Sequence, residues 1–284
     1  MYRTAGLWPD KLYLKILFRL RCGRKLDLKN PQSFNEKCQW LKLYNRRPEY
    51  ITMVDKYAVK EYVSNIIGSK YVIPALGVWN SFDDIDFDEL PEQFVLKCTH
   101  NSGASVVVKD KSLMDKEKAR KVLEQGLKYN YYKFKREWPY KDCPPRIVAE
   151  RYIDSLGNSS SVEYKLTCMD GQAMVITVCT GPAHSAERCN DNFSRDWKRQ
   201  DWYASHPPVG GDIHRPAQMD EIIRLSEKLS EGIPQVRVDW YLDNGNIYFG
   251  EFTFFTMGGF AIFTPAEWDY KLGEWIPLPE KVVK

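Results

Sequence analysis

Two pairs of strand-like segments, each joined by a tight turn, constrain the fold of this chain most. They are residues 162–168 and 172–180 around Asp170-Gly171, and residues 235–241 and 246–254 around Asp243-Asn244-Gly245. Asp-Gly and Asn-Gly suit two-residue hairpin turns, because the favoured turn needs a positive φ at both central positions. We therefore expect antiparallel hairpins to dominate the second half of the molecule.

The rest of the chain mixes helical and extended patterns. We expect helices over residues 10–22, 34–43, 53–65, 115–129 and 217–231, and further strands over residues 71–74, 94–98, 106–108 and 146–152. Ser33 and Glu36 form a capping-box pattern at the start of the second helix, whereas residues 184–216 show no regular period. The whole pattern predicts the α/β (α+β) class, with mixed and antiparallel sheets and flanking helices.

Composition excludes several classes of protein. With 284 residues, 43% of them apolar and 28% charged, the chain is expected to bury a core and to be neither disordered nor membrane-spanning. The seven cysteines include no CxxC pair, which favours reduced thiols over a disulfide framework or a zinc site. Lys15 and Arg19 interrupt the apolar run near the N-terminus, so we expect no secretory signal and predict a cytoplasmic protein.

The net charge of +3 conceals an uneven distribution. Residues 1–30 carry eight basic side chains against two acidic ones, a balance of +6, so the remaining residues sum to −3. The near-neutral total argues against nucleic acid as a partner. The basic side chains within residues 11–25 could instead make a peripheral contact with an anionic membrane, or this helix could pack against the rest of the protein.

The last predicted hairpin carries charged side chains that need partners. Because strand side chains alternate between faces, Arg237 and Asp239 point the same way. Glu251 and Thr253 share a face of the partner strand, and the turn brings the two pairs together. Two interpretations are open, since buried charges must be paired or bind a cation. One is an ion pair within the sheet. The other is a magnesium site, because Mg²⁺ prefers one or two carboxylates plus substrate phosphates.

Three further clusters carry weaker patterns. Lys97 ends a strand that opens into the small residues 101–105, where backbone N–H groups could approach phosphate oxygens. An ordinary hairpin loop would look the same. Residues 150–153 end a strand whose backbone could bind a purine ring. Glu163 and Lys165 share a strand face, either as part of a site or as a surface ion-pair ladder.

Taken in order, these runs resemble the ATP-grasp superfamily, in which two lobes close on ATP, and more narrowly its TupA-like (teichuronopeptide biosynthesis) family of polysaccharide gene clusters. The resemblance covers about residues 8–280 and rests on residues 34–37 (FNEK), 55–57 (DKY), 94–100 (FVLKCTH), 137–140 (EWPY), 237–239 (RVD) and 249–254 (FGEFTF). It implies an N-terminal helical region of residues 1–90, an ATP-grasp lid of residues 91–155, and a C-terminal ATP-grasp subdomain of residues 156–284 that holds the metal.

The resemblance also implies roles for single residues. The positive groups beside the ATP phosphates would be Lys97, Lys165 and Arg237. The mobile loop over those phosphates would be Asn101, Ser102, Gly103, Ala104 and Ser105, and the hinge that holds adenine would be Glu150, Arg151, Tyr152 and Ile153. Asp239 and Glu251 would bind Mg²⁺. Thr253 stands where many ATP-grasp enzymes carry an asparagine ligand, and Glu163 where an aspartate is more common.

From the same resemblance we expect an ATP- and Mg²⁺-dependent ligase that joins a carboxylate to an amine through an acyl phosphate. The family implies bacterial surface polysaccharide synthesis (capsule, O-antigen or teichuronopeptide). The acceptor would be a carboxylated glycan or lipid-linked saccharide, amidated by an amino acid or another amine. Three alternatives stay open: a glycosyltransferase that uses Asp84 and Asp86 as a metal-binding pair, a sugar kinase on the same fold, and a non-catalytic nucleotide-binding scaffold.

Two segments combine aromatic and basic residues and are candidates for acceptor binding. They are residues 129–141 and residues 193–206, the latter with Trp197 and Trp202. Aromatic faces stack on sugar rings, and arginine or lysine can hold a uronate. Packing between lobes would explain the same pattern. Of the four histidines, only His100 lies beside a predicted site.

Overall fold

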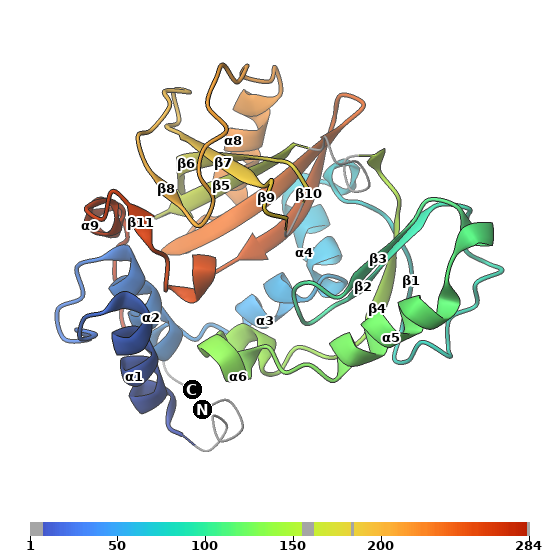
Figure 1. Ribbon diagram of the computed structural model, residues 1–284, viewed down its shortest axis with the longest axis horizontal. Helices are drawn as coiled ribbons and strands as arrows, with labels where there is room; N and C mark the ends of the chain where they lie inside the picture. Colours follow the sequence, from blue (N-terminus) through green and yellow to red (C-terminus); the bar gives the residue numbers. More distant parts are fainter. Residues whose placement is uncertain (1–7, 155–161, 183–184, 283–284) are drawn as a thin grey trace.

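Two antiparallel sheets form the framework of the protein (Figure 1). The computed structural model describes residues 8–154, 162–182 and 185–282, so the predicted boundary between residues 155 and 156 lies outside the described residues. The smaller sheet has the order β1-β4-β2-β3. Its strands are β1 (Ala75–Trp79), β2 (Phe94–Cys98), β3 (Ser105–Val108) and β4 (Ile147–Arg151). Strand β1, which comes from the predicted N-terminal region, pairs with β4.

The larger sheet contains both predicted hairpins and has the order β10-β9-β5-β6-β7. Its strands are β5 (Glu163–Met169), β6 (Gln172–Thr180), β7 (Cys189–Phe193), β9 (Gln235–Asp243) and β10 (Asn246–Thr253). Both turns adopt the expected backbone, with positive φ at Asp170 and Gly171 and again at Asn244 and Gly245. The hairpin predictions are therefore confirmed.

Helices and several short elements connect the strands of the two sheets. The helices are α1 (Asp10–Cys22), α2 (Phe34–Tyr44), α3 (Glu49–Val54), α4 (Ala58–Ile67), α5 (Lys116–Leu127), α6 (Tyr132–Lys135), α8 (Met219–Leu229) and α9 (Trp268–Glu274). The short elements are the 3₁₀ turns η2 (Ser69–Tyr71), η3 (Lys111–Leu113), η4 (Trp138–Tyr140) and η5 (Thr256–Gly258), and a two-stranded ribbon of β8 (Tyr203–Ala204) and β11 (Phe263–Thr264). The capping box of Ser33 and Glu36 is present at the start of α2.

Two local predictions are wrong, and one segment without a predicted element contains strands. The helix predicted over residues 53–65 is split into α3 and α4, because the Asp55 carboxylate accepts the N–H groups of Tyr57 and Ala58 and caps a new helix. In place of the strand predicted over residues 71–74, the chain has the end of η2 and an isolated bridge between Val72 and Phe249, and β1 begins at Ala75. Residues 184–216 contain β7 and β8, which carry too few apolar side chains to show a strand period.

The larger sheet has one apolar face, which packs in the core, and one polar face. Val236, Val238 and Trp240 of β9 are fully buried, and the indole N–H of Trp240 donates to Ser226 Oγ of α8 at 2.8 Å. The smaller sheet packs one face against α5, where Phe94, Leu96 and Leu123 join one apolar cluster. The other face of the smaller sheet and the polar face of the larger sheet carry the charged side chains.

Candidate functional site

Charged and polar side chains form rows across the polar face of the larger sheet. Direct cross-strand pairing aligns Asp239 with Lys165, Lys165 with Thr177, and Thr177 with Asn192. A neighbouring row begins at Arg237, which pairs with Thr167. Since residues directly opposite each other share a face, the predicted site residues on β9 and β5 lie together.

Asp239 is the centre of this group. Its carboxylate is buried and accepts two hydrogen bonds from Arg237, from Nε at 2.6 Å and Nη2 at 2.7 Å. Lys165 Nζ lies 3.0 Å from the same carboxylate and 3.1 Å from Glu163, and Glu163 also pairs with Arg188. Burial alone would raise the pKa of Asp239, but the charges of Arg237 and Lys165 outweigh it and keep that pKa below its ordinary value.

A β-bulge sets the position of Glu251. Phe249 pairs with Trp240 and Phe252 with Val238, so Gly250 and Glu251 together face the single residue Asp239. A Cβ at Gly250 would lie 2.9 Å from the ring of Tyr241 and 3.1 Å from the Asp239 carbonyl oxygen. Glycine therefore allows the close approach of the two strands here. Beyond the bulge, Thr253 pairs directly with Arg237, as predicted from the hairpin.

Lys56 connects this sheet to the predicted phosphate loop. Its Nζ lies 3.7 Å from Glu251 Oε2 and donates to the Asn101 carbonyl oxygen at 2.6 Å. Glu251 Oε1 is 3.9 Å from Arg237 Nη2, so both oxygens of this carboxylate face cations without a tight bond. Lys56 lies in the break between α3 and α4. Its role was not predicted from the sequence, because the contact depends on a residue 45 positions away.

The donor set suits a magnesium ion that is shared with phosphate groups. Two carboxylates, Asp239 and Glu251, lie on paired strands, and one of them is only loosely held. Among the described residues no group of three or more His, Cys, Asp or Glu side chains could hold a metal by itself. Mg²⁺ is usually bound by one or two carboxylates together with substrate phosphates and water, so the residues present fit this ion.

The smaller sheet supplies a second buried ionic group. Lys97 of β2 and Lys60 of α4 each lie 2.6 Å from Glu150 of β4. Burial alone would raise the pKa of Glu150, but the charges of Lys97 and Lys60 lower it to about 2. The Glu150 carboxylate therefore serves to hold two lysines on this face. Ser105 and Val107 share the face and are exposed, which leaves room above the strands.

The predicted phosphate loop is anchored at its first residue. The buried Asn101 side chain donates to the Gly126 carbonyl oxygen of α5 at 2.7 Å, and the Ala104 side chain lies against Gly126. Ser102, Gly103 and Ser105 are exposed. Gly103 has a φ of +95°, a conformation that glycine adopts without strain. The loop thus presents its exposed residues near Lys97 and Lys56.

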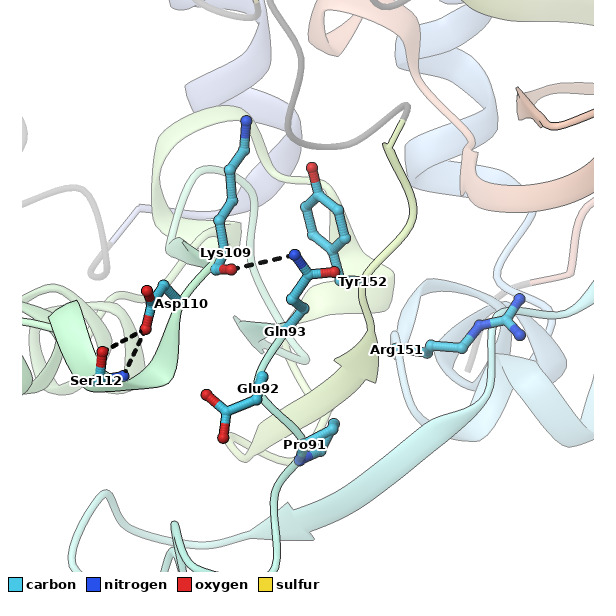
Figure 2. Close-up of a pocket in the computed structure, with 8 residues that line it drawn as sticks. All are labelled: Pro91, Glu92, Gln93, Lys109, Asp110, Ser112, Arg151 and Tyr152. Carbon is cyan, nitrogen blue, oxygen red and sulfur yellow. Dashed lines mark hydrogen bonds between the residues drawn. The ribbon is translucent and has the colours of Figure 1, made fainter.

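The predicted hinge reaches the larger sheet through its side chains. The Arg151 N–H donates to the Pro74 carbonyl oxygen at 3.0 Å, and Arg151 Nη2 donates to the Tyr248 hydroxyl of β10 at 2.8 Å. Ile153 is buried in a small cluster with Tyr248. Figure 2 shows Tyr152 beside Gln93 and Lys109 in a hollow at one end of the smaller sheet, with Arg151 turned away from them.

The two aromatic and basic segments differ in their surroundings. Tyr129, Tyr131, Phe134 and Lys135 line an open pocket of about 400 Å³ together with Arg21 and Met257, among others. In the other segment Trp197 stacks on Phe193 and Trp202 stacks on Trp268. The rings of both segments pack on neighbouring rings, since Tyr129 stacks on Phe134 as well, and the first segment also lines this open pocket.

The two aspartates of the alternative glycosyltransferase interpretation lie away from the charged rows of the larger sheet. Asp84 accepts the N–H of Ser81 and Asp86 that of Asp88, within exposed turns. His100 is buried next to the loop, and burial lowers the pKa of its imidazole.

Comparisons with known proteins identify the family. The chain matches the family model of the TupA-like ATP-grasp proteins over residues 36–277. A search of curated proteins found no match. The similar solved structures include the following three. One is a D-alanine–D-alanine ligase from Bacillus anthracis complexed with ATP, at 18% identity and a TM-score of 0.43, covering 72% of this chain and 55% of that chain.

Another is a D-alanine–D-alanine ligase from Helicobacter pylori, at 14% identity and a TM-score of 0.47, covering 87% of this chain and 70% of that chain. The third is a RimK domain ATP-grasp protein from Sphaerobacter thermophilus, at 12% identity and a TM-score of 0.44, covering 82% of this chain and 70% of that chain. The chain thus spans about half of the Bacillus anthracis ligase. Because the family model covers most of the sequence, the chain belongs to the TupA-like ATP-grasp family and has the ATP-grasp fold.

Proposed function

We propose that the protein is an ATP-dependent ligase that joins a carboxylate to an amine, with ATP converted to ADP and phosphate. The observation that carries the proposal is the site between the sheets. The carboxylates of Asp239 and Glu251 lie beside Arg237 and Lys165, and Lys56 links Glu251 to the loop that follows Lys97. This is an arrangement of fixed charges suited to phosphoryl transfer.

The residues of the chain have separable tasks in this proposal. Lys97 and Lys56 would bind phosphate oxygens, while Glu150 keeps Lys97 in place on its strand. Asp239 and Glu251 would hold Mg²⁺, which supplies charge neutralisation when bound. Arg237 and Lys165 lie in the same rows and would stabilise negative charge at the reacting carboxylate. Residues 150–153 would hold the purine, and the exposed part of the loop would exclude water.

A carboxylated glycan, free or lipid-linked, is the proposed acceptor. The pocket that includes Tyr129, Tyr131 and Phe134 offers aromatic rings, and Arg21 and Lys135 add two positive charges. This combination suits a sugar that carries a carboxylate. Together with the family, it supports a role in bacterial surface polysaccharide synthesis, with an amino acid or another amine as the second substrate. We propose that this chemistry takes place in the cytoplasm.

The test is a mass-resolved assay of ATP turnover with carboxylated glycans and a set of amines. A ligase forms ADP, phosphate and an amide whose mass equals that of the two substrates less one water. A sugar kinase, the second candidate on this fold, would give a phosphorylated glycan without any amine. Turnover of UDP- or GDP-sugars without ATP would overturn the proposal in favour of a glycosyltransferase.

A further inference from the structure

A second open pocket lies between the first two helices, which Figure 1 shows side by side at one end of the molecule. It has a volume of about 680 Å³ and is lined by residues of α1, α2, the loop between them and the segment after α9. That segment is tied to α2, because the Val282 N–H donates to the Tyr44 carbonyl oxygen and the Arg46 N–H to the Val282 carbonyl oxygen. Of the residues described, none lines both this pocket and the one at Tyr129.

Four lysines line this pocket, which we call the lysine pocket. They are Lys11 and Lys15 of α1, Lys29 of the loop and Lys281 of the segment after α9. All four side chains are exposed, and in the part of the chain that the structure describes none of them makes an ion pair. Asp27 also lines the pocket, but its carboxylate accepts the N–H groups of Lys29 and Asn30 in its own loop.

The lysine pocket concentrates positive charge. Lys11 and Lys15 are four positions apart on one helix, a spacing at which like charges repel each other. The other two lysines extend the same field from different segments of the chain. A neighbouring cation, Arg46, is by contrast paired with Asp10 at 2.7 Å. An anion bound in the pocket would therefore remove a repulsion between the lysines.

The number and kind of the charged groups restrict the chemistry of this anion. Four lysines against one aspartate give the wall of the pocket a formal charge of +3. A phosphate monoester carries a charge of about −1.5 to −2 at pH 7, and a lysine ammonium binds phosphate oxygens as a compact point charge. A carboxylate or a phosphodiester carries a single negative charge and neutralises less of the wall. A terminal phosphate or a diphosphate is therefore favoured.

An exposed row of apolar side chains beside the pocket indicates that the phosphate belongs to a lipid. Leu12, Ile16 and Leu20 recur every fourth residue along one side of α1, and Trp8 continues this spacing just before the helix. Trp8, Leu12 and Leu20 are 41%, 49% and 65% exposed. The two lysines of α1 each precede a member of this apolar row by one position. Apolar side chains next to lysines are typical of a helix that lies in a membrane interface.

From these observations we propose that the lysine pocket binds the terminal phosphate or diphosphate of an anionic membrane lipid, while the apolar row of α1 enters the lipid layer. The pocket is separate from the proposed ligase site, and the inference goes beyond that function, because it assigns a membrane contact to the protein. Binding of the lipid requires no ATP, so the inference stands or falls independently of the ligase.

The experiment measures binding of the whole protein to phosphatidylcholine vesicles by co-sedimentation. The vesicles are plain, contain phosphatidic acid, which has a terminal phosphate, or contain phosphatidylserine, a phosphodiester, at the same surface charge. The double variant Lys29→Gln/Lys281→Gln removes two cations of the pocket and leaves α1 unchanged. Lys118→Gln/Lys121→Gln is the matched control, because both lysines are exposed on α5 and the change in net charge is the same.

Two further measurements separate a lipid headgroup from a soluble phosphate. Inorganic pyrophosphate is titrated into the protein without vesicles, and Leu12→Ser/Leu20→Ser interrupts the apolar row. We expect this second variant to weaken binding to vesicles and to leave binding of pyrophosphate as in the wild type. Pyrophosphate that binds in the pocket while vesicles with phosphatidic acid do not would assign the pocket to a soluble ligand and overturn the inference.

We expect stronger binding to vesicles with phosphatidic acid than to those with phosphatidylserine. The pocket variant should weaken binding to phosphatidic acid about tenfold or more, equal to ~1.4 kcal/mol, and the α5 control should bind like the wild type. Equal binding to the two anionic vesicles, or an equal loss in the pocket variant and the control, would show a response to overall charge alone and overturn the inference. So would a wild type that binds none of the vesicles.

Discussion

At the scale of single residues, the two carboxylates proposed to bind magnesium differ in what surrounds them. Asp239 is buried and held by Arg237 and Lys165, so its removal would take away the carboxylate that these two cations share, a costly change. Glu251 is partly exposed and has cations only at 3.7 and 3.9 Å. Glu251 is therefore the better residue with which to test the metal role.

We predict that Glu251→Gln lowers ATP turnover on the order of 100-fold, because a neutral amide is a poor magnesium ligand. The concentration of Mg²⁺ that gives half-maximal turnover should rise. Glu267→Gln, at an exposed glutamate near α9, serves as the control. Turnover of Glu251→Gln at the wild-type rate under limiting Mg²⁺ would refute the assignment.

The ionisation of Glu150 makes the free energy of unfolding depend on pH. Its pKa in the folded protein is about 2, against an ordinary value of 4.5. Its contribution is therefore fully present above about pH 4.5 and is lost as the pH falls towards 2. Glu150→Gln should be less stable than the wild type at pH 7 by about 3 kcal/mol, and the gap should narrow below pH 4.5. Urea unfolding between pH 7 and 3 measures this, and a constant gap would contradict it.

Some of the site residues could be placed from the sequence, and others could not. Arg237, Asp239 and Thr253 could be placed on one face because strand alternation and a short turn are local rules. The function of Lys60 could not be predicted, because its carboxylate partner Glu150 is distant in sequence and reaches it only through the fold. The binding roles proposed for Asp239, Glu251 and the other site residues stay predictions.

At the scale of elements, the hairpins could be predicted from their turn residues, whereas the break between α3 and α4 could not be predicted from the local sequence. Asp55 is fixed both by local N–H groups and by Arg146, whose Nη2 lies 2.7 Å away. Such a long-range partner leaves no periodic signal in the sequence. The capping box at α2, in contrast, depends only on residues close together in the sequence, and it is present as expected.

Ser33→Ala tests the capping box. Loss of the hydroxyl removes the cap on the Glu36 N–H and a contact with Arg24, so the free energy of unfolding should fall by about 1 kcal/mol. Ser69→Ala, at an exposed serine whose side chain caps no helix, should leave it unchanged. Equal unfolding midpoints in urea for the two variants would show that the cap contributes little.

The first helix has one face for the protein and another for solvent. Tyr13, Leu14 and Phe18 of α1 are buried, which accounts for the apolar residues of this segment. Lys15, Arg19 and Leu20 are exposed. No helix in the described part of the chain is long and apolar enough to span a membrane. Contact with an anionic membrane through the exposed face of α1 therefore stays a proposal.

Charge reversal at Lys15, Arg19 and Arg21 tests that proposal by co-sedimentation with vesicles. Each basic group near an anionic surface contributes about 1 kcal/mol. The triple variant should therefore lose most of any binding to phosphatidylserine vesicles, and neither protein should bind neutral vesicles. Binding unchanged by the reversal would exclude a role for α1.

At the scale of the whole molecule, the two sheets touch through few polar bridges near the site. Lys56 spans the loop and Glu251, and Arg151 spans the hinge and Tyr248. A ligand that binds between the sheets adds to these bridges and stabilises the closed arrangement by mass action.

We predict that ADP with Mg²⁺ raises the melting temperature and slows amide hydrogen exchange in residues 101–105. Lys56→Met should reduce both effects, because it removes the cation that ties the loop to Glu251. Lys121→Met, at an exposed lysine of α5, is the control. Equal protection in Lys56→Met and the wild type would show that the bridge plays no part in closure.

The bulge at Gly250 has a consequence for how β10 can change during evolution. Phe249 and Phe252 both face the core although an odd number of positions separates them, so the extra residue shifts the phase of the strand. Deleting Gly250 would remove the bulge and restore strict alternation with Phe249 and Phe252 still on the core face, and it would leave Glu251 alone opposite Asp239. The bulge therefore serves the position of Glu251 and not the packing of the core, so a homologue that is one residue shorter here should keep the fold and present this glutamate differently.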